Sequence, residues 1–274
     1  MDFKLALIGC GEAGSTFAGA AEWGGSARSW DILAERRASM AATGVIAAED
    51  AAEALAGADL VLSLVTADAA LAAAREYAPL LKPGAVWCDM NSVAPATKMS
   101  AAQAVEAAGG CYVDGAVLAP VHPARLAVPL LLAGQAAAEA EAMLRAAGFD
   151  NIRVVGQDVG RASAIKMIRS VMVKGIEALT AEMMLAARAA GVADEVLASL
   201  DASEKVRSWH DRAAYNLDRM VTHGARRAAE MEESAKTLAA LGVDPVMTRG
   251  TVARQSEMAG QIQHLAFEQQ SDAA

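Results

Sequence analysis

The sequence is poor in aromatic residues and has no apolar run long enough to cross a membrane. Only 4% of its 274 residues are aromatic, although 54% are hydrophobic. The core must therefore be built from Ala, Leu, Val, Ile and 13 Met residues, a mixture that favours helices and argues against an all-β fold. Charges interrupt the Ala-rich segments before they reach the roughly 18 apolar residues of a spanning helix. The first apolar run is too short for a signal peptide, so we expect a soluble, cytoplasmic protein.

Basic charge is also scarce. The chain has 24 basic and 33 acidic residues, and the resulting net charge of −9 argues against a nucleic-acid partner. Three cysteines, an odd number with no CxxC pair, predict free and buried thiols in a reducing compartment: they are Cys10, Cys88 and Cys111. The histidines lack the spacing of a metal site, so we expect no metal: they are His122, His210, His223 and His264.

The first part of the chain alternates between short apolar runs and Ala-rich segments of helix length. The runs fall at residues 4–8, 59–65, 85–89 and 152–155, and residues 28–30 are expected to form a second strand between the first two. This rhythm is typical of βαβ units, and continuous apolar runs are typical of strands that are buried on both faces. We therefore expect a parallel sheet up to about residue 160.

The second part has no strand signals and consists of long helical segments. Apolar residues recur there at steps of three or four: Ile165, Ile168, Met172, Ile176, Leu179 and Met183. Gly191 and Gly242 are typical helix ends. The apolar face of a long helix must be buried against another surface. We therefore expect an all-helical domain, and we expect it to pair with a second copy of the chain as a homodimer.

A GxGxxG motif follows the first predicted strand and precedes an Ala-rich helix. Such glycines allow a tight turn, close approach to a pyrophosphate and close packing of helix on strand. Asp31 ends the second predicted strand 20 residues after Gly11, where dinucleotide-binding domains place an acidic residue. We expect the cofactor to be bound by Gly9, Gly11, Glu12, Ala13, Gly14, Asp31, Val65, Thr66 and Asn91.

These observations predict an α/β fold, a Rossmann-type doubly wound parallel sheet followed by an all-α C-terminal domain. The expected domains are 1–160 for dinucleotide binding and 161–274 for the substrate and dimerisation. Asp31 favours NAD, because a carboxylate accepts hydrogen bonds from the ribose 2′-OH and repels a 2′-phosphate. Arg36 and Arg37 leave NADP open as a second cofactor, although they read equally well as solvated charges at the start of a helix.

The sequence resembles the β-hydroxyacid dehydrogenases, which include 3-hydroxyisobutyrate dehydrogenase and 6-phosphogluconate dehydrogenase. The resemblance rests on residues 9–14 (GCGEAG), 89–97 (DMNSVAPAT), 112–117 (YVDGAV) and 160–166 (GRASAIK). The C-terminal half, with residues 166–170 (KMIRS) and 222–227 (THGARR), is similar to the less characterised 6-phosphogluconate dehydrogenase-like branch.

The resemblance implies an NAD(P)-dependent oxidoreductase that oxidises a hydroxyl group β to a carboxylate. In that family the lysine that matches Lys166 accepts and donates the proton of the hydroxyl group. We expect Lys166 to be a buried amine whose pKa is lowered by desolvation. The alternative for this residue is a surface lysine on an amphipathic helix.

Two departures from the family put the substrate in doubt. Ser170 stands where relatives carry Asn, and residues 118–120 are Leu-Ala-Pro where relatives carry Ser-Gly-Gly to receive the substrate carboxylate. The expected substrate-binding residues are Leu118, Ala119, Pro120, His122, Arg169, Ser170 and His223. His223, Arg226, Arg227 and Glu230 share one helix face, which is either a carboxylate site or a salt-bridged surface.

Two other functions remain open. Relatives with this architecture reduce imines, but those usually lack the lysine. The other alternative is a nucleotide-binding sensor or assembly protein that catalyses no reaction. The altered residues 118–120 and Ser170 are consistent with this function.

Overall fold

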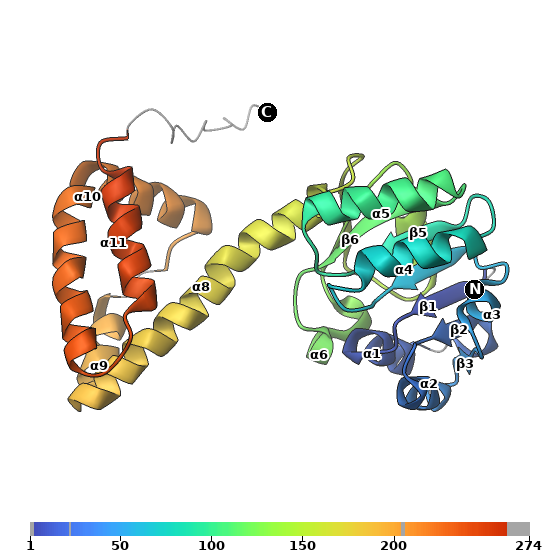
Figure 1. Cartoon of the computed structure of the whole chain (residues 1–274), viewed down its shortest axis with the longest axis horizontal. Helices are drawn as coiled ribbons and strands as arrows, with labels where there is room; N and C mark the ends of the chain where they lie inside the picture. Colours follow the sequence, from blue (N-terminus) through green and yellow to red (C-terminus); the bar gives the residue numbers. More distant parts are fainter. Residues whose placement is uncertain (1–2, 22, 204–205, 262–274) are drawn as a thin grey trace. The chain divides into compact units, whose positions relative to one another are not determined.

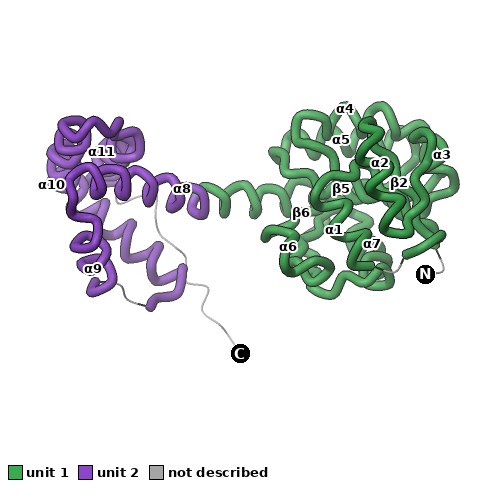
Figure 2. Tube along the Cα trace, turned by 90° about the horizontal axis from the view of Figure 1, so that it is seen from below, with its two compact units in different colours: residues 1–171 green, residues 172–274 purple. Residues whose placement is uncertain are grey.

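The computed structural model describes residues 3–21, 23–203 and 206–261. The chain divides into two compact units, Met1–Val171 and Met172–Ala274 (Figure 2). The division falls inside helix α8 (Arg161–Ala190), whose first residue follows directly on the boundary expected at residue 160.

The first unit is built on a sheet of eight strands in the order β3-β2-β1-β4-β5-β6-β7-β8. The strands are β1 (Leu5–Ile8), β2 (Ala27–Trp30), β3 (Ile46–Ala47), β4 (Leu60–Ser63), β5 (Val86–Asp89), β6 (Cys111–Val117), β7 (Leu130–Ala133) and β8 (Ile152–Gly156). All neighbours are parallel except β6 and β7. The chain leaves β1 for β2 and returns to β4 on its other side, which makes a topological switch point beside β1.

The apolar runs form strands because both of their faces are covered. Leu5 and Leu7 belong to one buried cluster, and Ala6 and Ile8 belong to the cluster on the opposite face. The Rossmann-type fold is confirmed, with one correction to the expected parallel sheet. The connection from β6 to β7 contains only short helical turns and no full crossover helix. Strand β7 therefore returns antiparallel to β6.

Helices cover both faces of the sheet (Figure 1). Residues of α1 (Glu12–Ala20), α2 (Ala34–Ala41) and α7 (Ala137–Ala146) pack in the cluster that contains Leu5. Residues of α3 (Ala51–Leu55), α4 (Ala70–Tyr77) and α5 (Pro95–Ala107) pack in the cluster that contains Ile8. A single turn, α6 (Val121–Ala124), follows β6.

All the regular secondary structure among the described residues of the second unit is helical. The unit contains the end of α8, then α9 (Ala193–Ser203), α10 (Trp209–Ala240) and α11 (Val246–Met258). Helices α10 and α11 pack closely at Gly224, where a Cβ would overlap the backbone oxygen of Gln255. Among the described residues, no helix is both long and apolar enough to cross a membrane.

A buried carboxylate fixes the start of α11. Glu182 of α8 is 6% exposed and accepts hydrogen bonds from the backbone N–H groups of Met247 and Thr248 at 2.7 and 2.8 Å. It also accepts one from the Thr248 hydroxyl at 2.6 Å. Burial raises the pKa of Glu182, but these hydrogen bonds outweigh burial and hold the pKa below its usual value. The helix N-terminus thereby gains a charged cap.

Candidate functional site

The turn between β1 and α1 has a shape that requires its glycines. A Cβ on Gly9, whose φ is +95°, would lie 2.6 Å from backbone atoms of Leu64. A Cβ on Gly14 would lie 2.6 Å from the backbone oxygen of Gly9, so α1 packs directly on the loop. At Gly11 the nearest atom belongs to the side chain of Arg36, at 3.1 Å. The backbone at Gly11 is therefore open to a ligand, and the three glycines meet the three needs of a dinucleotide loop.

A cavity of 470 Å³ lies beside this turn. Its lining includes six of the expected cofactor-binding residues: Gly9, Gly11, Glu12, Asp31, Val65 and Thr66. Helix α1 begins at Glu12, and its N-cap residue Gly11 makes no side-chain cap bond. The first N–H groups of the helix are therefore suited to a phosphate.

Asp31 and Arg36 contribute opposite charges to this cavity. Asp31 accepts hydrogen bonds from the backbone N–H groups of Cys10 at 2.7 Å and Leu33 at 2.9 Å. Its carboxylate thus joins the glycine-rich turn to the end of β2. Arg37 does not line the cavity; its guanidinium lies over the Trp30 ring at 4.6 Å and donates to the Asp31 backbone oxygen. Arg36 is therefore the arginine placed to meet a phosphate.

A second cavity, of 430 Å³, shares Glu12, Leu64 and Val65 with the first. Residues from three further segments complete it, including Ala13, Asn91, Ser92, Ala119, Pro120 and Lys166. Two segments that are far apart in sequence therefore meet beside the glycine-rich turn: the loop after β5 and the start of α8.

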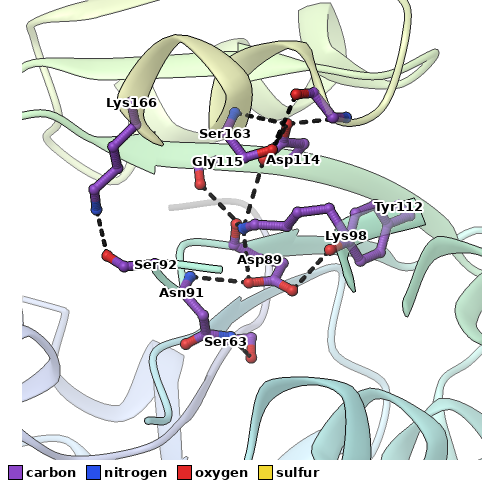
Figure 3. Close-up of polar contacts among 11 residues, drawn as sticks. Ser63, Asp89, Asn91, Ser92, Lys98, Tyr112, Asp114, Gly115, Ser163 and Lys166 are labelled. Carbon is purple, nitrogen blue, oxygen red and sulfur yellow. Dashed lines mark hydrogen bonds and ion pairs between the residues drawn. The ribbon is translucent and has the colours of Figure 1, made fainter. Parts of the chain in front are cut away.

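Lys166 donates a hydrogen bond from Nζ to Oγ of Ser92 at 2.5 Å (Figure 3). The lysine is half-buried, whereas the sequence predicted a buried amine. The correction has a simple cause, because the side chain lines an open cavity and does not enter the apolar core. An amine and a hydroxyl held together in this way are suited to proton transfer.

Asn91 has an acceptor that the protein leaves unused. The side chain is 4% exposed, and its Nδ2 donates to Ser63 Oγ at 2.9 Å. Its Oδ1 is buried without a partner among the described residues. A buried, unpaired carbonyl oxygen is costly, so a donor on a ligand in the cavity would be favoured at this atom.

Behind the cavity lies a buried charge cluster that sequence reasoning missed (Figure 3). Lys98 of α5 is fully buried and forms ion pairs with Asp89 at 2.9 Å and Asp114 at 3.5 Å. Its Nζ also donates to the backbone oxygens of Asp89 at 2.5 Å and Gly115 at 3.2 Å. Asp89 in turn accepts from the Asn91 backbone N–H at 2.9 Å. The cluster therefore fixes the loop that carries Asn91.

The second carboxylate of this cluster caps α8. One oxygen of Asp114 accepts from the N–H groups of Gly160 and Ser163, and from the Ser163 hydroxyl, each at 3.0 Å. The capped turn begins the helix that carries Lys166. Lys98 thus joins the strand ends that support both partners of the Lys166–Ser92 hydrogen bond.

The remaining titratable groups near the cluster are held in their neutral forms. Burial, together with the Asp89 carboxylate, raises the pKa of Tyr112 far above its usual value, and its hydroxyl donates to Asp89 at 2.7 Å. Burial raises the pKa of Cys88 to about 12. Away from the cluster, in the glycine-rich turn, burial also raises the pKa of Cys10 to about 11. These two thiols are buried as expected, whereas Cys111 is half-buried.

The other predicted substrate residues are less closely grouped. His122 lines neither cavity, and its Nε2 lies 2.9 Å from Thr16 Oγ1 of α1. Arg169 donates to the backbone oxygen of Leu118 at 3.1 Å, so it supports the 118–120 loop from outside. Ser170 lines neither cavity, and His223 lies on α10 in the second unit.

Comparisons with known proteins cover nearly the whole chain. Residues 4–156 match the family model of the NAD binding domain of 6-phosphogluconate dehydrogenase. Residues 187–258 match a domain of unknown function, DUF1932.

Solved structures show the same fold. A conserved hypothetical protein from Sinorhizobium meliloti 1021 is 39% identical over 97% of this chain and 92% of that chain, with a TM-score of 0.62. A protein of unknown function, described as similar to 3-hydroxyacid dehydrogenases, is 28% identical over 93% and 96%, with a TM-score of 0.60. An imine reductase variant from Myxococcus stipitatus, in complex with NAD⁺, is 20% identical over 94% of both chains, with a TM-score of 0.77.

Proposed function

Since the chain belongs to the family of the NAD binding domain of 6-phosphogluconate dehydrogenase, we propose that it oxidises a β-hydroxy acid or related alcohol with NAD(P). Its first unit is an NAD-binding domain, and its structural neighbours include an imine reductase and a protein described as similar to 3-hydroxyacid dehydrogenases. The observation that carries the proposal is the Lys166–Ser92 hydrogen bond in the cavity that adjoins the glycine-rich turn.

The residues fit a dinucleotide. The turn at Gly9 and Gly14 has no space for a Cβ, the N-terminus of α1 is uncapped by a side chain, and Asn91 has an unpaired acceptor. We assign the diphosphate to Gly11 and the first turn of α1, and the ribose to Asp31. When bound, the nicotinamide accepts a hydride from carbon or returns it.

Lys166 supplies the proton chemistry in this proposal. As the substrate hydroxyl is oxidised, its proton passes to a neutral Lys166 Nζ while the C–O bond becomes a carbonyl. In the reverse direction the ammonium group returns that proton to the oxygen. Ser92 holds Nζ towards the cavity, and the cluster around Lys98 holds Ser92 and α8 in place.

A spectrophotometric screen tests the proposal. The full chain is assayed at 340 nm with NAD and NADP against β-hydroxy acids, sugar acids, phosphorylated sugar acids and arylalkyl alcohols. We expect one class to be oxidised, and we expect Lys166→Ala to lower kcat by about 10²–10⁴ while NADH binding is retained. The matched control is Lys174→Ala, an exposed lysine on the same helix. Equal losses in both variants would rule out the role of Lys166.

Imine reduction is the second candidate, because an imine reductase shares the fold over nearly the full length of both chains. Lys166 would then donate a proton to the reduced nitrogen. The same assay run with NADPH and cyclic imines separates the two reactions. Consumption of NADPH with an imine, and no activity towards any hydroxy acid, would replace the first proposal.

We also propose that the chain forms a homodimer through its second unit. Helices α8 and α9 expose large apolar side chains: Ile176, Leu179, Leu185, Leu197 and Leu200. A largely apolar cavity of 520 Å³ lies among α8, α9 and α10. Large apolar side chains exposed on two helices of one unit favour association. Light scattering should give twice the 28.2 kDa of one chain. Leu200→Glu should reduce that mass, and Val206→Glu, at a fully exposed position, should not.

A further inference from the structure

The second unit contains a polar cavity that the proposed reaction does not use. It measures 340 Å³ and is lined by residues of α10 and α11: Tyr215, Asn216, Arg219, Met220, Arg227 and Gln255. No carboxylate is among these residues, although the chain carries a net charge of −9. The cavity is therefore locally basic in an acidic protein.

Among the described residues, the two arginines of this cavity have no anionic partner. Within the part of the chain that the structure describes, neither Arg219 nor Arg227 forms an ion pair, and the Nε atom of each is buried without a hydrogen-bond acceptor. Arg219 Nη1 donates to the Tyr215 hydroxyl, an uncharged acceptor, at 2.7 Å. The adjacent Arg226 differs, because it is exposed and ion-paired with Glu230. Partly buried guanidinium groups without an anion are unfavourable unless a ligand supplies one.

An unpaired acceptor lies in the same cavity. Gln255 is 7% exposed, and its Oε1 is buried without a donor among the described residues. The residue is held firmly, because α11 contacts α10 at Gly224, directly at the backbone of Gln255. Three residues that line the cavity therefore each carry one buried polar atom without a partner among the described residues: Nε of Arg219, Nε of Arg227 and Oε1 of Gln255.

We propose that this cavity binds a small hydroxylated oxyanion, a compound with a phosphate or carboxylate group beside a hydroxyl. Arginine side chains bind both kinds of oxyanion through paired hydrogen bonds. The hydroxyl group of the ligand donates to Gln255 Oε1, so the ligand satisfies all three unpaired atoms. A volume of 340 Å³ is at the lower end of small-molecule pockets, which run from about 300 to 1,000 Å³. The proposal is independent of turnover at Lys166.

Side-chain NMR of the full-length protein tests the site directly. The Nε–H signals of the arginines are followed during titration with inorganic phosphate, glycerol phosphate and glycerate, with and without NAD to occupy the glycine-rich turn. We expect the Arg219 and Arg227 signals to shift saturably with at least one of these oxyanions. Tighter binding of glycerol phosphate would identify the anionic group as a phosphate, and tighter binding of glycerate would identify it as a carboxylate. Either result supports the binding of a hydroxylated oxyanion.

Two neighbouring arginines provide a matched pair of variants. Arg227→Met should weaken oxyanion binding by at least about tenfold, because it removes a charge-assisted donor. Arg226→Met should leave the affinity within about twofold. Gln255→Met should weaken glycerol phosphate but not inorganic phosphate.

Three results would overturn the proposal. One is the absence of saturable shifts in the unmodified protein, a measurement that does not depend on any variant folding. Another is equal weakening by Arg226→Met and Arg227→Met. The third combines two observations: the unmodified protein binds no oxyanion, and Arg227→Met lowers the oligomeric mass. Together they would indicate that a carboxylate of a second copy of the chain occupies the cavity.

Discussion

At the scale of single residues, two lysines of the first unit have very different surroundings. Lys166 lines a cavity, whereas Lys98 is fully buried between two carboxylates. Because lysines are rarely buried, nothing in the sequence suggested a buried role for Lys98. The motif match pointed to Lys166 alone. The spacing of Asp89, Lys98 and Asp114 gives no sign that they meet, because their contact depends on the pairing of β5 with β6.

The buried lysine predicts a large stability effect. Lys98→Met leaves Asp89 and Asp114 buried without a counter-charge, and we expect it to lower the free energy of unfolding of the first unit by about 3–5 kcal/mol. Urea unfolding followed by fluorescence measures the loss. Lys82→Met is the control, since its pair with Asp59 is partly exposed to solvent and should contribute about 1 kcal/mol or less. Similar losses in the two variants would contradict the role given to Lys98.

Cofactor choice is also decided at single residues. Asp31→Asn removes the charge that repels a 2′-phosphate, so we expect the affinity for NADPH relative to NADH to rise by about tenfold. Arg36→Gln should change the ratio in the opposite direction. Fluorescence titration with both reduced cofactors gives the ratios. Glu35→Gln, an exposed neighbour on α2, should leave them unchanged.

At the scale of elements, α10 and α11 depend on one glycine for their close packing. Gly224→Ala places a methyl group against the Gln255 backbone and 3.2 Å from Cα of Ala259, so we expect a loss of about 1–3 kcal/mol. Thermal unfolding of the helical signal measures it. Gly175→Ala on α8 meets no atom within 4 Å and should stabilise that helix by up to about 1 kcal/mol. A loss of equal size at Gly175 would show that packing at Gly224 is not the cause.

The carboxylate cap on α11 predicts a pH dependence. Because the pKa of Glu182 is lower in the folded chain, its contribution is complete above its ordinary value of 4.5 and is lost as the pH falls through the folded pKa. Melting of the helical signal between pH 3 and pH 7 should show this loss. Glu182→Gln should reduce the melting temperature most at neutral pH. Glu177→Gln, exposed on the same helix, should follow the unmodified protein.

The elements also show how far the sequence predicts the fold. Strands β1, β4 and β5 were predictable because each is a continuous apolar run buried on both faces. Strand β3 has two residues and gives no such signal. Strands β6 and β7 were not among the predicted apolar runs. The antiparallel return of β7 was missed as well, because strand direction depends on the path of the connection and not on the apolar pattern of the strand.

At the scale of the whole molecule, motif order predicted the family, whereas the grouping of side chains around the cavity that contains Lys166 could not be predicted from sequence spacing. The glycine spacing of residues 9–14 is read directly from the sequence, because each glycine answers a local backbone need. His122 was expected near the substrate but contacts Thr16, and such a contact depends on how α6 meets α1. Arg219 and Gln255 gave no signal, because their relation requires two helices to pack.

The capped start of α8 has a consequence for amide hydrogen exchange. The Gly160 and Ser163 amides donate to a carboxylate that is itself paired with Lys98 inside the sheet, so they should exchange with solvent only when the sheet opens. Amides beyond Val171 on the same helix belong to the other compact unit. One uninterrupted helix should therefore show two protection levels, with the step between them at the residue where the two units divide.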